Sequence, residues 1–234
     1  MKIENAVALV TGANRGIGLA FARELLARGA RKVYAGARNP VTVTQAGVEP
    51  LQLDVNKPED VAAAAALASD VTLVINNAGI AQPGGFLAPD SEEVARRIFE
   101  TNFFAMLRMS KAFAPVLAGN GGGALLNVLS IASWVNGGEL AAYSASKAAA
   151  WSLTNALRHE LAAQKTQVLA LHMGYVDTDL TRGFDVPKSS AQEIVGRALD
   201  GLEAGLDEVL ADERTEQVKR GLTAARPSYL PQAA

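Results

Sequence analysis

Short, almost uniformly hydrophobic runs alternate with amphipathic stretches along the whole chain. Such runs are typical of strands buried on both faces, which belong to parallel sheets covered by helices on each side. We therefore predict an α/β fold, a doubly wound domain around a seven-stranded parallel sheet. The expected strands are AVALVTG, KVYAGAR, PLQLDV, VTLVINNAG, ALLNVLS, QVLALHM and EVLAD. The expected helices begin near Gly16 and at Pro58 and run along Ser91–Leu117, Ala142–Ala163 and Ala191–Ala204.

The composition narrows the classes of function. The 234 residues include 22 basic and 24 acidic ones without a basic tract, which argues against nucleic acid and anionic lipid as partners. The chain has no cysteine and two isolated histidines, His159 and His172, so we expect no metal site. MKIENAVALV leads directly into the first expected strand, and no apolar run reaches membrane-spanning length. We therefore expect a cytoplasmic protein without membrane contact.

A glycine-rich segment, TGANRGIG, lies between the first expected strand and the first expected helix. Unpaired backbone N–H groups and the positive end of the helix dipole attract phosphate at such a helix start. Gly12 would permit a tight turn, Gly16 a close approach to a pyrophosphate, and Gly18 close packing of helix on strand. The segment predicts a dinucleotide site, and a purely structural turn is the alternative.

The segment YSASK begins a later helix and places Tyr143 and Lys147 four residues apart, on one helix face. A neighbouring ammonium stabilises a phenolate and lowers the pKa of the tyrosine, which would make Tyr143 a general acid and base. The alternative is a solvated helix face, where such pairs are common.

Several motifs occur in a fixed order along the chain: TGANRGIG, Asp54 in LDV, NNAG at 76–79, Asn102 in a long helix, Ser130 after ALLNVL, and YSASK. In this order and spacing they resemble the short-chain dehydrogenase/reductase family over essentially the whole chain. The resemblance implies that residues 1–234 form a single NAD(P)-binding Rossmann-type domain with a built-in substrate site. It also implies hydride transfer between a nicotinamide and a small carbonyl or alcohol substrate.

The resemblance assigns roles to four catalytic candidates. Tyr143 would exchange a proton with the substrate oxygen, and Ser130 would hydrogen-bond that oxygen and polarise the carbonyl. Lys147 would hold the cofactor ribose and lower the pKa of the tyrosine. Asn102 would hold a water that connects the lysine to solvent, or would satisfy a local helix distortion.

The resemblance also implies a set of cofactor contacts. Asp54 would meet the adenine edge or else begin a turn before Pro58, Asn77 is expected to be structural, and Met173 stands where the family usually has proline. The full set of expected contacts is Gly12, Asn14, Arg15, Gly16, Ile17, Gly18, Arg38, Asp54, Val55, Asn76, Ala78, Gly79, Tyr143, Lys147, Gly174, Val176 and Thr178.

Two arginines favour a phosphorylated cofactor. Family members specific for NAD place an acidic residue at the end of the second strand, whereas this chain has Ala37 followed by Arg38. Arg38 and Arg15 could pair with a 2′-phosphate from two sides, unless both are solvated surface arginines. We therefore expect NADP(H) as the preferred cofactor, NAD(H) as the secondary one, and carbonyl reduction as the usual direction.

Residues near the expected catalytic groups suggest an apolar substrate pocket, and hence an uncharged ketone, aldehyde or secondary alcohol. Trp134, Tyr175 and Phe184 either line this pocket or belong to the core. The other apolar candidates are Ile80, Phe86, Ile131 and Val135.

Two rival functions remain open at this point. A non-catalytic dinucleotide-binding regulator would keep the glycine turn and lose catalytic groups, yet all four catalytic candidates are present. A sugar-nucleotide epimerase-like enzyme needs additional carboxyl-terminal length, and only a short stretch follows the last expected strand.

The helix over Ser91–Leu117 and the helix of Tyr143 carry Met106, Phe113, Trp151 and Leu157 on more than one side. This is more apolar surface than one sheet face should bury, and members of the family usually pair through these helices. We therefore expect a homodimer or homotetramer.

Overall fold

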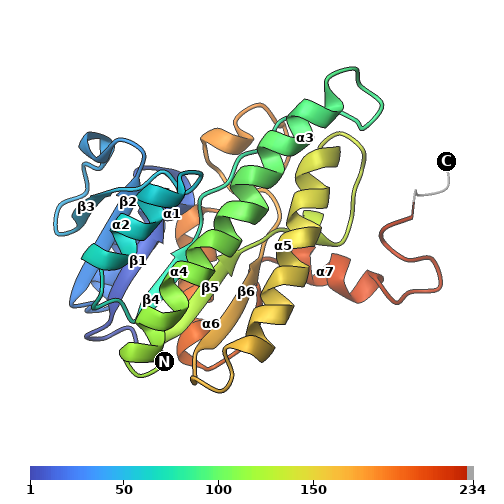
Figure 1. Ribbon diagram of the computed structural model, residues 1–234. Helices are drawn as coiled ribbons and strands as arrows, with labels where there is room; N and C mark the ends of the chain where they lie inside the picture. Colours follow the sequence, from blue (N-terminus) through green and yellow to red (C-terminus); the bar gives the residue numbers. More distant parts are fainter. Residues whose placement is uncertain (231–234) are drawn as a thin grey trace.

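The computed structural model describes residues 1–230, so the last four residues of the expected domain, 231–234, lie outside the described residues (Figure 1). One sheet contains seven strands, all parallel, in the order β3-β2-β1-β4-β5-β6-β7. This confirms the predicted doubly wound α/β fold and its seven strands. The strands are β1 Val7–Thr11, β2 Lys32–Ala37, β3 Glu49–Gln52, β4 Leu73–Asn76, β5 Ala124–Val128, β6 Gln167–His172 and β7 Glu208–Leu210.

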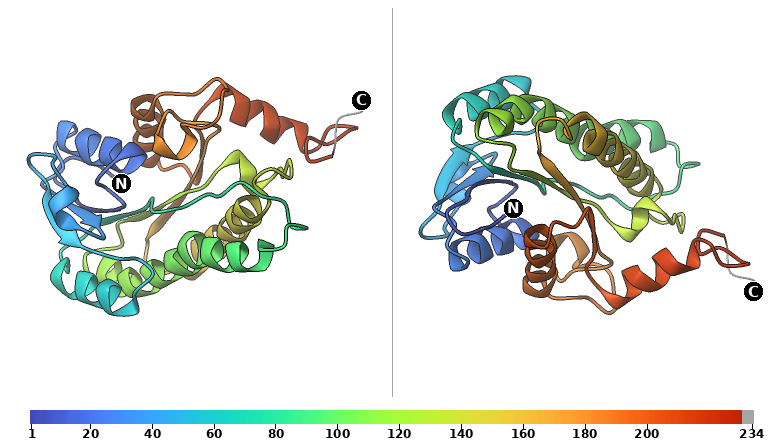
Figure 2. Two further views of the ribbon diagram at one scale, coloured as in Figure 1. Left: turned by 90° about the horizontal axis from the view of Figure 1, so that it is seen from above. Right: turned by 90° about the horizontal axis from the view of Figure 1, so that it is seen from below.

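The helices cover both faces of the sheet. Helices α1 and α6 lie together on one face, with α7 beyond them, and α2, α4 and α5 cover the other face (Figure 2). The bounds of the helices are α1 Gly16–Ala27, α2 Pro58–Leu67, α3 Ser91–Phe99, α4 Ala105–Gly119, α5 Ala141–Glu160, α6 Ala191–Glu203 and α7 Glu213–Gly221. None of the helices in residues 1–230 is long and apolar enough to cross a membrane.

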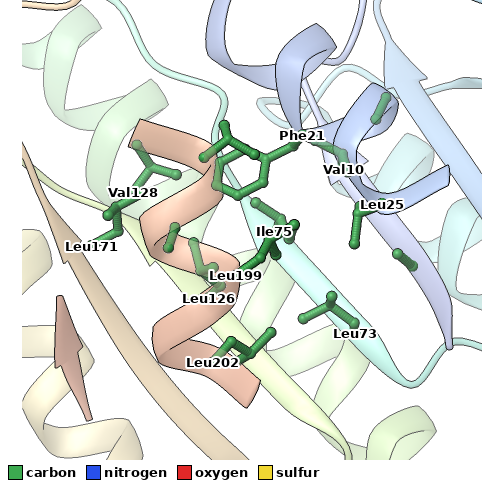
Figure 3. Close-up of a cluster of buried hydrophobic side chains, with 14 of the residues drawn as sticks. Val10, Phe21, Leu25, Leu73, Ile75, Leu126, Val128, Leu171, Leu199 and Leu202 are labelled. Carbon is green, nitrogen blue, oxygen red and sulfur yellow. The ribbon is translucent and has the colours of Figure 1, made fainter. Parts of the chain in front are cut away.

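Alternate residues of the central strands enter two separate cores, as expected for strands buried on both faces. Val10 of β1 packs under α1 and α6, whereas its neighbour Leu9 packs toward the opposite helices. Figure 3 shows the first of these cores, where Phe21 of α1 and Leu199 of α6 meet above the strands. Burial of this kind is the main favourable contribution to folding.

Two features differ from the prediction. The expected helix over Ser91–Leu117 is interrupted by one π-helical segment, Glu100–Phe104, between α3 and α4. Such insertions leave the hydrophobic spacing almost unchanged and often occur at functional sites. Helix α7 was not expected, because ERTEQVKRG is polar on all sides and Thr215 is its only buried residue. Its sequence therefore lacks the apolar period that predicts a helix.

Candidate active site

The predicted site residues gather where the strand order reverses, between β1 and β4. The loops that follow β1, β4, β5 and β6 carry Gly12, Gly79, Ser130 and Gly174 in turn. In open parallel sheets this carboxyl edge is the place where ligands bind.

The glycine turn after β1 has the backbone conformation that its glycines permit. Gly12 and Gly16 have positive φ angles of 66° and 54°. A Cβ on Gly18 would lie 2.2 Å from the carbonyl oxygen of Gly12, so only glycine fits there. Helix α1 starts at Gly16 with no side-chain cap and no acidic residue in its first turn. Its first N–H groups are therefore suited to hold a phosphate.

The loop after β6 lies against this turn. Thr178 Cγ2 is 3.5 Å from the position of a Cβ on Gly16, and Arg15 Nη1 is 3.2 Å from Asp179 Oδ2. The structure thus brings Thr178 to the glycine turn, as the cofactor assignment requires. Arg15 is largely exposed, and Asp179 has a second partner in Arg182, so the ion pair leaves Arg15 able to turn to another anion.

The remaining candidates around the turn have distinct surroundings. Arg38 is exposed directly after β2, and Asn14 Nδ2 donates to Thr42 Oγ1 (3.2 Å). Ile17, in the first turn of α1, is partly buried, and Val55 is buried. Asp54 Oδ1 accepts from the N–H of Asn56 (3.1 Å), which corresponds to the turn before Pro58 that was the alternative to an adenine contact.

The hydrogen bonds after β4 distinguish side chains with a structural role from those that face the cleft. Asn77 Nδ2 donates to Thr11 O (2.9 Å), which is the structural role expected for Asn77. The Asn76 side chain lies in the core, where its Nδ2 donates to Asn127 Oδ1 (2.9 Å). A cofactor contact from Asn76 is therefore restricted to its backbone. Thr11 was missed by the sequence analysis: its Oγ1 accepts from the N–H of Ala78 (2.9 Å) and fixes the end of β4 to β1.

Gly79, Asn102 and Lys147 come together from three segments. A Cβ on Gly79 would lie 3.3 Å from Asn102 Oδ1 and 3.8 Å from Lys147 Nζ. The Asn102 side chain, placed by the π-helical segment, accepts from the N–H of Ile80 and donates to its carbonyl oxygen, both at 2.9 Å. It also donates to Ser146 Oγ at 2.9 Å, so that Asn102 connects the loop after β4 to α5.

Lys147 is a buried cation. Its Nζ donates to the carbonyl oxygen of Val128 (2.8 Å) and lies 5.7 Å from the centre of the Tyr143 ring. Burial lowers the pKa of Lys147 to about 8, because the charged ammonium loses hydration. The pair predicted from YSASK therefore lies in the protein and not on a solvated helix face.

Tyr143 differs from the expectation in its titration. Burial raises the pKa of Tyr143 to about 12; contact with the Ser130 hydroxyl lowers the pKa and the neighbouring Tyr175 raises it. The predicted lowering of the pKa by Lys147 is therefore not found in this structure, where loss of hydration dominates. Tyr143 holds its proton at neutral pH, as a proton donor must.

Ser130 is buried and its hydroxyl is oriented by its own loop. It precedes the 3-10 turn Ile131–Ser133, and its Oγ accepts from the N–H of Ala132 (3.1 Å). Its hydroxyl therefore has a fixed position next to Tyr143.

A cavity of about 450 Å³ opens in front of Ser130 and Tyr143. Tyr175 and Phe184 line it, with ring centres 5.4 Å apart, as do Ile131 and Val135. Two other expectations were wrong, because Ile80 and Phe86 are not part of the lining; Trp134, for which pocket and core were both open, is also absent from the lining. Trp134 instead stacks on His172, and Phe86 is exposed.

The sequence analysis missed part of the cavity wall. Arg214 of α7 and the segment 228–230 also line the cavity. The sequence carried no indication that these residues line a cavity, because they belong to the polar helix α7 and to the tail, far from every recognised motif.

The loop after β6 accommodates its unusual residue. Met173 is buried, and its carbonyl oxygen accepts from the N–H of Ile131 (2.9 Å), a bond that proline could form equally well. The N–H of Gly174 donates to Asp212 Oδ2 (2.7 Å), and Val176 is buried. The loop path is therefore fixed by contacts that do not depend on proline.

Comparison with known proteins agrees with this geometry. The family model described as short chain dehydrogenase matches residues 6–187. The chain belongs to the short-chain dehydrogenase/reductase family. It is accordingly an NAD(P)-dependent oxidoreductase.

Three similar members of the short-chain dehydrogenase/reductase family illustrate the range of this relationship. The chain is 30% identical over 200 residues to a 3-oxoacyl-(acyl-carrier-protein) reductase of Vibrio cholerae, with 82% of each chain covered. It is 34% identical over 207 residues to dehydrogenase/reductase SDR family member 4 of Oryctolagus cuniculus, with 82% of this chain and 79% of the relative covered. A short chain dehydrogenase of Burkholderia cenocepacia, solved in complex with NADP, is 42% identical, with a TM-score of 0.93 and 97% and 96% coverage.

Proposed function

We propose that this chain is an NADP(H)-preferring carbonyl reductase in which Tyr143 is the general acid and base. The observation that carries the proposal is that Ser130 and Tyr143 share one cavity wall, while Lys147 is buried beside Tyr143 next to the loop of Gly79. Three segments distant in the sequence thus meet where a carbonyl group and a nicotinamide would have to meet.

The residues of the site divide the chemistry between them. Bound NADP(H) supplies the hydride. Ser130 donates a hydrogen bond to the substrate oxygen, and Tyr143 gives that oxygen its proton during reduction or removes it during oxidation. Lys147 adds positive charge near the phenol, which favours loss of the proton when a substrate and cofactor fill the site.

Asn102 is proposed to act on Lys147 indirectly. Its side-chain bonds to Ile80 and Ser146 hold the π-helical segment close to Gly79 and the lysine. In this position Asn102 supports a water-mediated route by which Lys147 regains a proton from solvent. We retain all four catalytic residues, Asn102, Ser130, Tyr143 and Lys147, in this proposal.

The cofactor preference is proposed from charge. Ala37 ends β2 where family members specific for NAD have an acidic residue, Arg38 follows it, and Arg15 directly precedes α1. Both guanidinium groups are exposed and can reorient toward the phosphate. The similar Burkholderia cenocepacia protein was solved with NADP, which supports the same preference here.

One domain, residues 1–234, is proposed to carry both the cofactor site and the substrate site in the cytoplasm. The apolar cavity wall of Ile131, Val135 and Phe184 favours a small uncharged ketone, aldehyde or secondary alcohol. The Vibrio cholerae relative is a 3-oxoacyl reductase, so a 3-oxoacyl thioester belongs among the candidate substrates.

The experiment is a panel of ketones, aldehydes and 3-oxoacyl thioesters, each assayed for loss of nicotinamide absorbance with NADPH and with NADH. We expect at least one compound to be reduced, with higher kcat/KM for NADPH. Turnover that leaves the cofactor unchanged would favour the epimerase-like alternative. Binding of NADPH without turnover of any compound would favour the regulator.

A homodimer or homotetramer remains a prediction, but its original argument was wrong. Met106, Phe113 and Leu157 are buried within the protomer, and Trp151 packs against Trp134. The helices α4 and α5 therefore have less free apolar surface than the sequence suggested. Light scattering coupled to gel filtration at micromolar concentration tests the assembly, and a monomer mass would contradict it.

A further inference from the structure

Both tryptophans of the chain are partly buried and lie in one cluster around the buried His172, outside the cavity lining. Trp134 stacks on the imidazole of His172, with ring centres 4.0 Å apart at 23°, and meets Trp151 edge to face at 6.2 Å. Lys219 of α7 lies over the Trp134 ring at 4.7 Å. We call Trp134, Trp151, His172, Lys219 and Glu208 the tryptophan cluster.

His172 connects this cluster to the active site. Its Nδ1 lies 3.1 Å from the carbonyl oxygen of Ser130. A carbonyl oxygen can only accept, so Nδ1 carries the hydrogen and donates it. The imidazole is completely buried at the end of β6, and the stacked Trp134 ring restricts its rotation.

The surroundings of the second ring nitrogen, Nε2, and the burial of the ring determine the charge state of His172. Nε2 has no hydrogen-bond partner among the described residues and lies 3.5 Å from Glu208 Oε1. Burial is the main cause that lowers the pKa of His172 to about 4; Lys219 and Arg158 act in the same direction, and Ser130 and Glu208 oppose them. The imidazole is therefore neutral at pH 7, with its hydrogen directed at Ser130.

Helix α7 reaches the cluster through one side chain. Lys219 Nζ donates to both carboxylate oxygens of Glu208 on β7, at 2.7 and 2.8 Å, while it covers Trp134. These contacts form a chain from α7 and β7 through Trp134 and His172 to the backbone of Ser130. The same helix supplies Arg214 to the cavity wall.

We propose that His172 is a positioning residue for Ser130, and that α7 holds it in place through Lys219 and Trp134. The inference rests on the proposed function, because it assumes that the Ser130 hydroxyl polarises the substrate. The bond from His172 fixes the peptide group that carries the Ser130 side chain. Small displacements of such a group reduce turnover strongly, because reacting atoms tolerate little misalignment.

The first experiment compares His172→Leu with His172→Asn. The asparagine Nδ2 is the same number of bonds from Cα as the imidazole Nδ1, so it can donate to Ser130 O, whereas leucine cannot. We expect His172→Leu to lower kcat by about tenfold, with the KM for NADPH within about twofold of the parent, and His172→Asn to recover most of kcat. Parent-like kcat in His172→Leu, or equal loss in both variants, would overturn the proposal.

A second pair of variants avoids disturbing the core. Lys219→Met removes the cation over Trp134, and Arg220→Met is its matched control on the same helix, because Arg220 pairs with Glu216 at the surface (3.6 Å). We expect Lys219→Met to lower kcat by about threefold and Arg220→Met to leave it unchanged. Equal kcat in the two variants would contradict the role of α7 even if the His172 variants failed to fold.

An activity-independent measurement separates this inference from the proposed function. The N–H of Ala132 donates to Ser130 Oγ, so its amide resonance reports the position of the serine. We expect His172→Leu and Lys219→Met to shift this resonance and Arg220→Met to leave it in place. If the parent reduces no compound, the proposed function fails while the resonance still decides the positioning role; an unshifted resonance in Lys219→Met would refute that role.

Discussion

The cofactor side and the catalytic side of the cleft are built in different ways. On the cofactor side, the shape of the site is set mainly by the backbone. Gly12 and Gly16 adopt positive φ angles, and Gly18 leaves room for the turn. On the catalytic side, polar side chains are buried, and burial shifts the pKa of Lys147 down to about 8 and that of Tyr143 up to about 12. The first region depends on the backbone conformation of one short segment, whereas the second has to be stabilised by the rest of the fold because burying charged and polar groups costs free energy.

The starts of α1 and α6 differ in whether a side chain caps the free backbone N–H groups. Helix α6 is closed by a capping box, in which the Ser190 hydroxyl accepts from the N–H of Glu193 (3.1 Å) and the Glu193 carboxylate reaches back to Ser190. Helix α1 begins at Gly16 with no such cap. A cap satisfies the free N–H groups of a helix, so its absence at α1 leaves them available for a ligand.

The largest expected effect tests the catalytic side alone. Tyr143→Phe removes one hydroxyl, so kcat should fall by about a hundredfold or more, the contribution of a positioned acid and base. NADPH binding, measured by fluorescence titration, should stay within about twofold of the parent because the glycine turn is untouched. Near-normal turnover in the purified variant would show that Tyr143 is not the proton donor.

The next effect tests the cofactor side alone. In Gly18→Ala the new Cβ would lie 2.2 Å from Gly12 O and 2.6 Å from Asn77 Nδ2, so the turn must move. We expect the dissociation constant of NADPH to rise by about tenfold or more. The matched control is Gly196→Ala within α6, where the nearest atom to a new Cβ is Arg28 Nη2 at 4.0 Å, and binding should not change. Equal NADPH affinity in the two variants would contradict a backbone-built site.

A smaller effect tests the charge on the cofactor side. Arg38→Ala should lower the ratio of kcat/KM for NADPH to that for NADH by about tenfold, because a charge-assisted bond to the 2′-phosphate is lost. Arg31, an exposed residue just before the other end of β2, is the control, and Arg31→Ala should leave the ratio unchanged. A ratio unaltered by Arg38→Ala, or equal efficiencies in the parent, would reject the NADP(H) preference.

The smallest effect tests whether the catalytic side costs stability. The pKa of Lys147 is about 8 in the folded protein against 10.5 as its ordinary value. Between these values the unfolded chain binds the proton and the folded chain does not, so the free energy of unfolding rises with pH from about 8 to about 10.5. Below pH 8 the full cost of burying the charge is present.

Lys147→Met removes this cost but also removes the hydrogen bond to Val128 O. We expect a net increase of about 1 kcal/mol in the free energy of unfolding at pH 7, together with loss of turnover. Urea unfolding of parent and variant at pH 7 and at pH 10 measures the difference, which should shrink at the higher pH. A less stable variant at pH 7 would mean that Lys147 stabilises the fold.

Most of the fold could be predicted from sequence, because hydrophobic period is a local signal. The seven strands, the helix starts at Gly16 and Pro58 and the parallel arrangement were all confirmed. The π-helical segment around Asn102 and the polar helix α7 were missed. One extra backbone residue barely changes the spacing of apolar side chains, and a helix without an apolar stripe has no period to detect.

The candidate site, like the fold, was predicted from the sequence only in part. The residue types and their order indicated Ser130, Tyr143 and Lys147, but the direction of each side chain depended on neighbours far along the chain. The sequence left Trp134 open between the pocket and the core, and the structure stacks it on His172. Asn76 was assigned to the cofactor, and its side chain bonds Asn127 within the core.

The sequence by itself determined the parallel sheet and the glycine turn and indicated Tyr143 and Lys147 as a candidate acid–base pair, because each depends on residues close together in the chain. Only the tertiary structure decided the pKa of Tyr143, the contact between Gly79 and Lys147, and the link from α7 to Ser130. Loss of hydration is set by every atom packed around a group, and those atoms come from all parts of the chain. That is why an acid–base role for Tyr143 could be proposed from YSASK, whereas its proton affinity required the fold.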